Sequence, residues 1–326
     1  KFMEENTEQR VDLTLFSEKI QELKDRIASV IVGQEQTVDL VLTAILANGH
    51  VLIEGVPGVA KTLLARLTAR LINADFSRVQ FTPDLMPSDV LGTTVFNMKT
   101  NAFDFHQGPI FADIVLVDEI NRAPAKTQAA LFEVMEERQI SIDGTTHRMG
   151  DLYTILATQN PVEQEGTYKL PEAQLDRFLM KITMDYPSLE EEVNILERHH
   201  TNAALVKLDD IVPAITKEEL LSLRAFMNQV FVDRTLLQYI ALIVQQTRTS
   251  KAVYLGASPR ASVAMLQSSK AYALLQGRDF VTPEDIKFVA PYVLQHRLIL
   301  TAEAEMEGYS PVKVTQRLID KVEVPK

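Results

Sequence analysis

The chain contains no cysteine among its 326 residues. This absence excludes disulfide frameworks, thiolate metal sites, iron–sulfur clusters and cysteine nucleophiles. The chain is also short of basic residues, because 33 Lys and Arg stand against 44 Asp and Glu and leave a formal net charge of −11. Broad, sequence-independent binding to duplex DNA needs basic side chains that neutralise phosphates, so the acidic balance disfavours it.

Long apolar runs are missing as well. No window reaches the ~18 uncharged apolar residues of a membrane helix, and residues 1–9 are charged and polar, without the apolar centre of a signal peptide. We therefore expect a soluble, cytoplasmic protein without membrane insertion. Apolar residues make up 46% and charged residues 24%, which is typical of globular domains. The length predicts two domains of ~100–200 residues, or one large domain with a lid.

Glycine is concentrated in the first half, where nine of the 12 lie between Gly33 and Gly166. Glycine marks turns and close backbone approaches, so we expect short elements with functional loops there and mostly helix afterwards. Short apolar runs alternate with amphipathic segments, a pattern typical of a parallel sheet covered on both faces. The expected strands are 51–54, 77–82, 114–117, 153–158 and 180–183, and the expected helices are 14–29, 62–71, 125–137 and 172–178.

Two segments interrupt this alternation, and both are predicted to be β-hairpins. The first pairs residues 93–98 with 102–106. The second pairs 139–142 with 145–148 across the turn Asp143-Gly144, a strong two-residue hairpin signal. After Pro187, capping-box spacings such as Ser188 with Glu191 mark helix starts. We expect about five helices between residues 188 and 300.

A glycine-rich segment follows the first apolar strand and opens a helix, which is the context of a phosphate-binding loop. The segment reads Gly55-Val56-Pro57-Gly58-Val59-Ala60-Lys61-Thr62. Such a loop turns backbone N–H groups toward a phosphate, and the helix N-terminus adds positive potential. Lys61 is predicted to reach the β- and γ-phosphate oxygens, and Thr62 to ligate Mg²⁺. Ala60 stands where the pattern usually has its second glycine, and its methyl group restricts the backbone.

A second apolar strand ends in two carboxylates, Asp118 and Glu119. Unpaired charge at a buried strand end is costly, which indicates a cation nearby. Beside a phosphate loop, Asp118 is predicted to hold Mg²⁺, often through water, and Glu119 to orient and polarise the attacking water. Taken alone, the pair is better interpreted as a solvated strand end. The upstream Lys61-Thr62 pair favours the functional interpretation.

Together these motifs resemble an AAA+ ATPase. In the order and the residue identities of its motifs, the chain resembles the MoxR family over most of its length. The matching stretches are Gly33-Gln34, Gly55–Thr62, Gly108–Phe111, Asp118–Ala123, Ala157–Pro161, Leu170–Phe178 and Gly256–Ala261. The resemblance implies an α/β fold: a parallel-sheet P-loop AAA+ core with β-hairpin inserts, plus a smaller all-helical C-terminal lid domain. We expect an N-terminal helix in residues 1–30, the nucleotide-binding core in 31–187 and the lid in 188–326.

The resemblance also implies roles for residues whose local sequence leaves them open. Asn160 matches sensor 1, which helps position the attacking water, although Asn-Pro is also an ordinary turn former. Arg177 matches the arginine finger, which completes a neighbouring subunit's site; locally it could equally complement a helix dipole. Arg260 matches sensor 2 at the start of a lid helix, acting in its own subunit or in the neighbour. Arg122 could also face a neighbouring nucleotide.

The cofactors that the resemblance implies are ATP and Mg²⁺. The segment Val32-Gly33-Gln34 resembles the one that cradles adenine, with an ordinary turn between helices as the alternative. The predicted nucleotide-binding residues are therefore Val32, Gly33, Gln34, Gly55, Val56, Pro57, Gly58, Val59, Ala60, Lys61, Thr62 and Leu63. The six histidines show no ligand spacing, so we predict no transition-metal site built by the protein.

The hairpin inserts of AAA+ rings often face a central channel, where they touch substrate or a partner. This makes Phe103, Phe105 and Phe111 candidates for such contact, although aromatics at this spacing more often pack in a core. A channel that tracks DNA should carry basic hairpins. Residues 139–148 offer only His147 and Arg148 against Asp143, a weak basic signal.

The function implied by the resemblance is Mg²⁺-dependent ATP hydrolysis at the subunit interfaces of a ring, expected to be a hexamer. Hydrolysis is coupled to chaperone-like remodelling, assembly or maturation of protein complexes. A partner with a von Willebrand factor A domain is implied, because this chain has no such domain. The alternatives are a nucleic-acid-linked motor, a GTP-using enzyme resembling the McrB restriction subunit, and a nucleotide-binding scaffold without turnover. The intact Asp118, Glu119, Asn160 and Arg177 argue against the scaffold.

Overall fold

The structure is a computed structural model that describes residues 13–161, 167–201 and 208–325. One five-stranded sheet lies at its centre in the order β2-β5-β8-β1-β9, and each neighbouring pair runs parallel. Parallel neighbours need crossover connections, and helices supply them here. The parallel sheet predicted from the apolar runs is thereby confirmed. Its strands are β1 (Val51–Gly55), β2 (Phe76–Gln80), β5 (Ile114–Asp118), β8 (Thr154–Gln159) and β9 (Met180–Met184).

The two faces of this sheet form two separate apolar layers. Along β5, Ile114 and Leu116 belong to one buried cluster and Val115 and Val117 to the other, because successive side chains of a strand point to opposite faces. Full burial of each such side chain contributes ~1.5–3 kcal/mol. Helices α2 and α3 cover the first face and α5 the second. The helices of this half are α1 (Leu13–Val30), α2 (Glu35–Leu46), α3 (Lys61–Leu71), α4 (Pro87–Leu91), η1 (Ile120–Arg122), α5 (Ala125–Glu137), α6 (Glu172–Leu175) and α7 (Leu189–His200).

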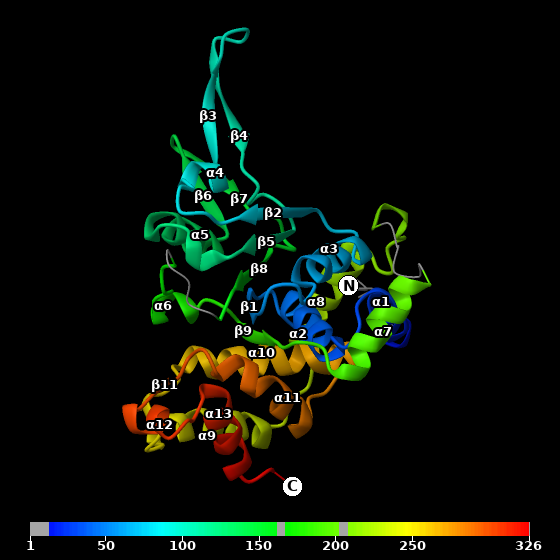
Figure 1. The fold of residues 1–326 in the computed structure, drawn as a ribbon, viewed down its shortest axis with the longest axis vertical. Helices are drawn as coiled ribbons and strands as arrows, with labels where there is room; N and C mark the ends of the chain where they lie inside the picture. Colours follow the sequence, from blue (N-terminus) through cyan, green and yellow to red (C-terminus); the bar gives the residue numbers. More distant parts are fainter. Residues whose placement is uncertain (1–12, 162–166, 202–207, 326) are drawn as a thin grey trace, which may run out of the picture.

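Both predicted hairpins are present. Strands β3 (Gly92–Asn97) and β4 (Ala102–Gln107) form the longer one, which projects well beyond the body of the molecule (Figure 1). Strands β6 (Gln139–Ile142) and β7 (Thr145–Arg148) form the shorter one. Its turn residues Asp143 and Gly144 have φ of +50° and +79°, as a tight two-residue hairpin turn requires.

The C-terminal part is helical, with one short antiparallel pair of strands, β10 (Val253–Leu255) and β11 (Ile299–Leu300). Five α-helices lie between residues 188 and 300 among the described residues, as expected. Their predicted caps at Ser188 and Thr216 are real capping boxes. The remaining elements are η2 (Leu208–Asp210), α8 (Lys217–Phe226), η3 (Met227–Gln229), α9 (Arg234–Thr249), α10 (Pro259–Leu275), α11 (Pro283–Leu294), α12 (Ala302–Met306) and α13 (Pro311–Lys321).

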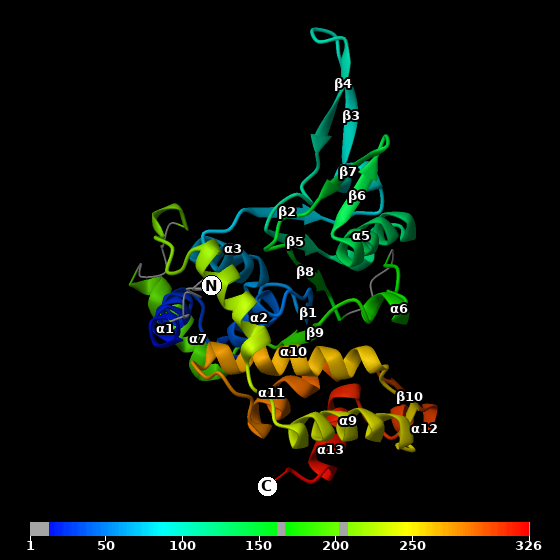
Figure 2. The ribbon, with the colours of Figure 1, turned by 180° about the vertical axis from the view of Figure 1, so that it is seen from behind.

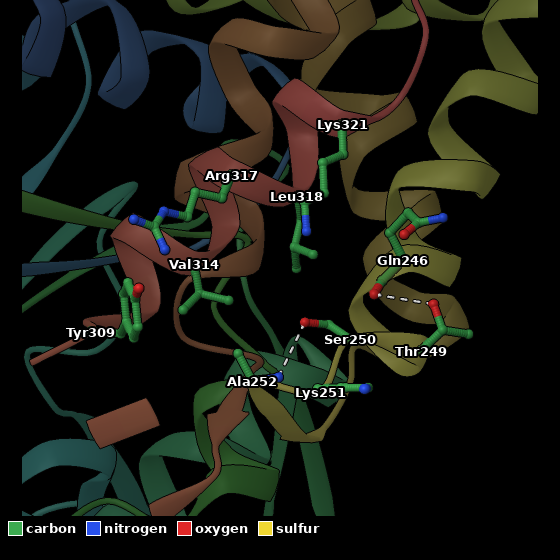
Figure 3. Close-up of a pocket in the computed structure, with 10 residues that line it drawn as sticks. All are labelled: Gln246, Thr249, Ser250, Lys251, Ala252, Tyr309, Val314, Arg317, Leu318 and Lys321. Carbon is green, nitrogen blue, oxygen red and sulfur yellow. Dashed lines mark hydrogen bonds between the residues drawn. The ribbon is translucent and has the colours of Figure 1, made fainter. Parts of the chain in front are cut away.

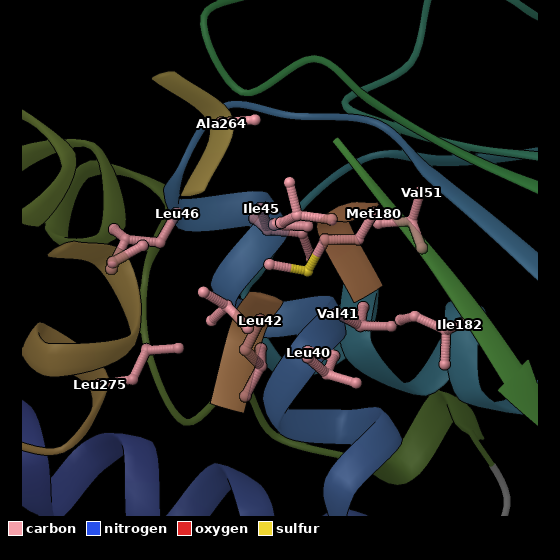
Figure 4. Packing of buried hydrophobic residues seen from close by; sticks show 14 of the residues in the cluster. Leu40, Val41, Leu42, Ile45, Leu46, Val51, Met180, Ile182, Ala264 and Leu275 are labelled. Atoms are coloured by element: carbon pink, nitrogen blue, oxygen red, sulfur yellow. The ribbon is translucent and has the colours of Figure 1, made fainter. Parts of the chain in front are cut away.

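The helical part and the sheet share one apolar cluster. Figure 4 shows side chains of α2, β1 and β9 meeting Ala264 and Leu275 of α10. Helix α8 is tied to the α/β part by polar contacts, in which Lys217 pairs with Asp113 at 2.5 Å and Arg224 Nη2 donates to Ile45 O at 2.5 Å. The lid is therefore packed on the sheet layer over a continuous core.

The structure corrects two details of the sequence-based expectations. The C-terminal part is not all helical, because β10 and β11 pair there; strands of three and two residues are too short to produce a periodic signal. The helix expected over 172–178 ends at Leu175, since Arg177 and Phe178 make turns of the i→i−3 type to Gln174 and Leu175. In the described residues, no helix is both long and apolar enough to cross a membrane.

Candidate nucleotide-binding site

The carboxyl ends of three neighbouring strands bring the predicted motifs to one edge of the sheet. Gly55 ends β1 and leads into the phosphate loop, Asp118 ends β5, and Asn160 follows β8. Because β5, β8 and β1 are adjacent and parallel, these ends lie side by side. In open α/β sheets this edge is the usual place for a ligand.

The phosphate loop connects β1 to α3 through residues with left-handed backbone. Gly58 has φ of +89°, and Ala60 has φ of +61° and ψ of +22° directly before the helical Lys61. A left-handed residue next to a right-handed one aims successive N–H groups the same way and forms an anion-binding concavity. Alanine adopts this conformation at a cost of roughly 1–2 kcal/mol. The loop geometry fits a nucleotide phosphate despite the methyl group of Ala60.

The side chains of the loop divide by their exposure. Pro57 and Gly58 are exposed, Val59 is buried, and Val56, Ala60 and Leu63 pack partly against the core. Thr62 is half-buried in the first turn of α3. Lys61 Nζ donates to Gly55 O at 2.6 Å, which keeps the amine over the loop. Burial lowers the pKa of Lys61, and the negative charges of Asp118, Glu119 and Glu54 oppose that shift.

The two carboxylates at the end of β5 have different surroundings. Asp118 is 7% exposed; its Oδ2 pairs with Arg78 Nε at 2.6 Å, and its Oδ1 accepts from Thr158 Oγ1 at 3.0 Å. Glu119 has φ of +55°, and its side chain is more open. Its Oε2 accepts from Gln80 Nε2 at 2.9 Å and Arg122 Nη1 at 3.0 Å. Both carboxylates are thus hydrogen-bonded, but the Asp118 carboxylate is buried while the Glu119 side chain is partly open to solvent.

Three residues that the sequence did not single out hold this pair. Thr158 of β8 donates to Asp118 and accepts from the backbone N–H of Glu119 at 3.0 Å. Arg78 and Gln80 of β2 contact one carboxylate each. The available signal was alternation, because residues 78 and 80 share one face of a strand that pairs with β5.

Asn160 lines a pocket of about 610 Å³ at the ends of β1, β8 and β9. Glu54 lies in the same pocket, where its Oε2 pairs with Lys181 Nζ at 2.8 Å and accepts from Gln159 Nε2 at 2.6 Å. The pocket therefore combines amides, a carboxylate and lysines, and the described residues that line it do not include the phosphate loop. Such a polar set is suited to phosphate and water rather than to an apolar ligand.

The segment Val32-Gly33-Gln34 connects α1 to α2. Gly33 has φ of +74°, a backbone conformation that favours glycine, and a Cβ there would lie 2.2 Å from Glu191 Oε1, so the carboxylate of Glu191 on α7 packs directly against this glycine. Gln34 Oε1 accepts from Thr37 Oγ1 at 2.9 Å. The two helices pack against each other, and α1 also contacts α3, the helix that follows the phosphate loop.

The two predicted arginines lie elsewhere. Arg177 Nη1 donates to Glu136 Oε2 at 3.1 Å and to Phe132 O at 3.2 Å. Arg260 lies 3.6 Å from Glu136 Oε1 and 3.9 Å from Asp176 Oδ2. Arg177 and Arg260 therefore both pair with Glu136, a residue of α5. The residues that they contact do not belong to the phosphate loop. Figures 1 and 2 place α6 and the start of α10 on one side of the molecule and α1, α3 and α7 on the other.

The aromatic candidates on the inserts separate into two groups. Phe105 and Phe111 pack with His147 of the shorter hairpin, at centroid distances of 4.3 Å and 6.3 Å, so they join the two hairpins to each other. Phe103 is 73% exposed and has an edge contact with Phe96 at 5.2 Å. Of the three phenylalanines, Phe103 has the surface that a partner could contact.

A second polar pocket in the described part of the chain has a different arrangement. A pocket of about 440 Å³ between α9 and α13 contains Lys251, Arg317 and Lys321. Figure 3 shows that these side chains diverge, with Arg317 turned toward Tyr309 and Lys251 pointing away from the pocket. Among the described residues, no group of three or more His, Asp and Glu side chains is placed to hold a metal ion.

The chain is similar to known proteins over most of its length. The chain matches the model of the ATPase family associated with various cellular activities (AAA) over residues 50–180 and that of the AAA lid domain over 245–320. YeaC of Bacillus subtilis is 47% identical, over 92% of this chain and 93% of that protein. Chaperone MoxR1 of Mycobacterium tuberculosis is 44% identical, over 92% and 81%. A crystal structure from Cytophaga hutchinsonii, named as a proposed ATPase, is 40% identical with a TM-score of 0.88, covering 96% of this chain and 97% of that one.

Proposed function

The chain belongs to the MoxR family of AAA+ ATPases, and from this premise we propose that it couples Mg²⁺-dependent ATP hydrolysis to the remodelling or assembly of protein complexes. The observation that carries the proposal is the sheet edge where Lys61, Asp118, Glu119 and Asn160 converge. A phosphate-binding lysine, a fixed carboxylate and an outer carboxylate at one edge are the parts that nucleotide hydrolysis needs.

Each residue at the edge has its own task in this proposal. Lys61 holds the β- and γ-phosphate oxygens, while Thr62 and Asp118 hold the magnesium ion. When bound, this ion neutralises charge on the phosphates. Glu119 takes a proton from the attacking water, and Asn160 orients that water. The partial exposure of the Glu119 side chain supports this assignment, because water can reach its carboxylate.

We propose that Arg177 and Arg260 both serve the nucleotide of a neighbouring subunit. Both contact Glu136, on the side of the molecule away from α3, and Arg260 is 67% exposed. Exposed ion pairs of this kind contribute only ~0–1 kcal/mol, so exchanging them for a nucleotide costs little. A closed ring lets every subunit complete its neighbour's site in this way, and six subunits is the number we propose.

The remaining assignments follow from the same premise. We propose an N-terminal unit in residues 1–30, of which residues 1–12 lie outside the described part of the chain, a nucleotide-binding core in 31–187 and a lid in 188–326, with the protein acting in the cytoplasm. Its clients are proteins, reached through the β3–β4 hairpin, where Met98 and Phe103 are exposed near the tip. An apolar tip suits a protein partner better than a nucleic acid, which calls for basic residues. A protein with a von Willebrand factor A domain is the proposed partner.

Turnover measured with ATP and with GTP, against protein concentration and with or without Mg²⁺, tests this proposal. We expect activity per subunit to rise with concentration, to favour ATP and to vanish without Mg²⁺. Turnover that is independent of concentration and of Mg²⁺ would contradict it. A preference for GTP would support the McrB-like alternative instead.

The hairpin assignment is tested separately. Phe103→Ala should weaken binding of a client or partner without changing basal ATP turnover, because Phe103 pairs with Phe96 near the turn of the β3–β4 hairpin, and this hairpin projects beyond the body of the molecule (Figure 1). Exposed aromatic anchors typically carry ~2 kcal/mol or more of an interface. Unchanged client binding would move the contact away from this hairpin.

A further inference from the structure

Three consecutive side chains from the lid hold the segment that carries Arg177. Gln295, His296 and Arg297 directly follow α11, and all three are buried. Gln295 Nε2 donates to Lys181 O at 2.5 Å, and His296 Nε2 donates to Phe178 O at 2.9 Å. Their acceptors lie more than 110 residues earlier in the chain, Phe178 in the connection between α6 and β9 and Lys181 in β9 itself. The lid thus contacts both this connection and the strand that follows it.

Arg297 makes most of these contacts. Its Nε donates to Asp176 Oδ1 at 2.7 Å, its Nη2 to Phe178 O at 2.7 Å and Asp176 O at 3.2 Å, and its Nη1 to Leu179 O at 3.1 Å. Nη1 also donates to Val293 O on α11. The guanidinium is 4% exposed, and a buried charge persists only where its donors are satisfied in this way.

Arg177 lies between two of the residues that Arg297 holds, Asp176 and Phe178. Helix α6 spans only four residues, which is too short to fix a backbone by its own hydrogen bonds. Arg177 itself is anchored by one exposed ion pair to Glu136 and one bond to Phe132 O. The position of its backbone therefore depends on the lid more than on its own helix.

We propose that Arg297, with Gln295 and His296, is a positioning residue for the arginine finger: the lid of one subunit sets where Arg177 stands in the active site of the next. The proposal rests on the shared-site function proposed above. It makes the lid–core contact a route by which lid movement in one subunit changes hydrolysis in its neighbour. A displacement of about 1 Å at a catalytic group can cost ~10²-fold in rate, so a small shift is sufficient.

The alternative is that Arg297 only joins the lid to the core of its own subunit. Subunit mixing separates the two. Arg297→Met subunits keep an intact phosphate loop, and Lys61→Ala subunits keep an intact Arg177. In an equimolar random mixture, about a quarter of the interfaces pair an intact loop with an intact finger. The matched control is Arg278→Met, which removes an arginine whose recorded contacts, to Asp285 and Phe280 O, lie within the lid.

We expect Arg297→Met alone to lose ~10–100-fold in turnover, with nucleotide affinity changed less than about threefold. Adding Lys61→Ala subunits should restore turnover, as it should for Arg177→Ala. Arg278→Met should keep its turnover. Absence of rescue for Arg297→Met, beside clear rescue for Arg177→Ala, would overturn the positioning role and leave the shared site standing. Absence of rescue for both would overturn both proposals.

Amide hydrogen exchange provides a second test, which does not depend on turnover. If Arg297→Met does not fold, Arg297→Lys replaces it in this measurement. The Phe178 amide bonds to Leu175 O and the Leu179 amide to His50 O. We expect these two amides to exchange at least ~10-fold faster in the variant, since local opening sets their protection. Amides of the central strand β5 should keep the wild-type rate. Unchanged exchange at Phe178 and Leu179 would contradict a positioning role.

Discussion

The nucleotide half of the site and the arginine half are held in place by different means. Lys61, Asp118 and Asn160 follow strands of one sheet, and the side chains of β1, β5 and β8 beneath them are almost all fully buried. Arg177 lies two residues after the four-residue helix α6. Arg260 lies in the first turn of the lid helix α10. The first half thus rests on the buried sheet core, whereas the second adds side-chain contacts with the lid beside the buried Phe178. In the proposed shared site, these lid contacts are the ones through which one subunit can influence the next.

Substitution of Arg177, the proposed arginine finger, should distinguish the two halves of the site most strongly. Arg177→Ala should reduce turnover by ~10³–10⁵-fold, because an arginine that neutralises transition-state charge has that effect in related enzymes. Nucleotide binding should change little, since Arg177 contacts Glu136 and Phe132 O in its own subunit. Turnover and fluorescent-nucleotide binding measure the two effects. Arg234→Ala, an exposed arginine on the lid, is the control, and an equal loss in that variant would remove the special role of Arg177.

Changing the outer carboxylate tests the nucleotide half in the same assay. Glu119→Gln should keep ATP binding and lower turnover by ~10²–10⁴-fold, because an amide cannot accept the proton of water. The amide keeps an oxygen for Gln80 and Arg122, so the local structure should survive. Glu133→Gln on the exposed face of α5 is the control. Near-normal turnover in Glu119→Gln would assign the base to another group.

The sequence could predict features that depend on local spacing, but not contacts between segments that are distant in the chain. The strands, the phosphate loop, both hairpins and the Asp118-Glu119 pair follow from local spacing, and the structure places them as expected. The partners Arg78, Thr158 and Arg297 were not predicted, because each contact joins segments far apart in the chain, up to 121 residues for Arg297 with Asp176. Periodicity reports which face of an element is buried but not which side chain meets it.

His50, directly before β1, and His296, two residues after the end of α11, are both buried. Acid should therefore lower the stability of the folded chain through both histidines. Burial lowers the pKa of His50 to about 3, helped by Arg138, and burial beside Arg297 lowers the pKa of His296 well below 6.5. The unfolded chain binds these protons below pH ~6.5 and the folded chain does not, so stability falls as pH drops from there toward 3. No such loss arises from these groups above pH ~7.

The expected slope is up to ~1.4 kcal/mol per pH unit for each of the two histidines. Urea unfolding at pH 7, 6 and 5, followed by circular dichroism, measures it. His50→Gln should reduce the slope, and His106→Gln, at an exposed position on β4, should not. An equal slope in both variants would show that His50 does not control the acid response.

The smallest effect concerns the backbone of the nucleotide half. Ala60→Gly removes a left-handed strain of roughly 1–2 kcal/mol, while the greater freedom of glycine in the unfolded chain offsets ~0.4–1 kcal/mol of that gain. The net change should be a stabilisation of less than ~1.5 kcal/mol, which thermal unfolding can detect. Ala129→Gly, the same substitution in the exposed middle of α5, should instead destabilise by ~0.5–1 kcal/mol. Opposite signs for one chemical change would show that the left-handed loop conformation exists in solution, and equal signs would argue that the loop adopts another backbone there.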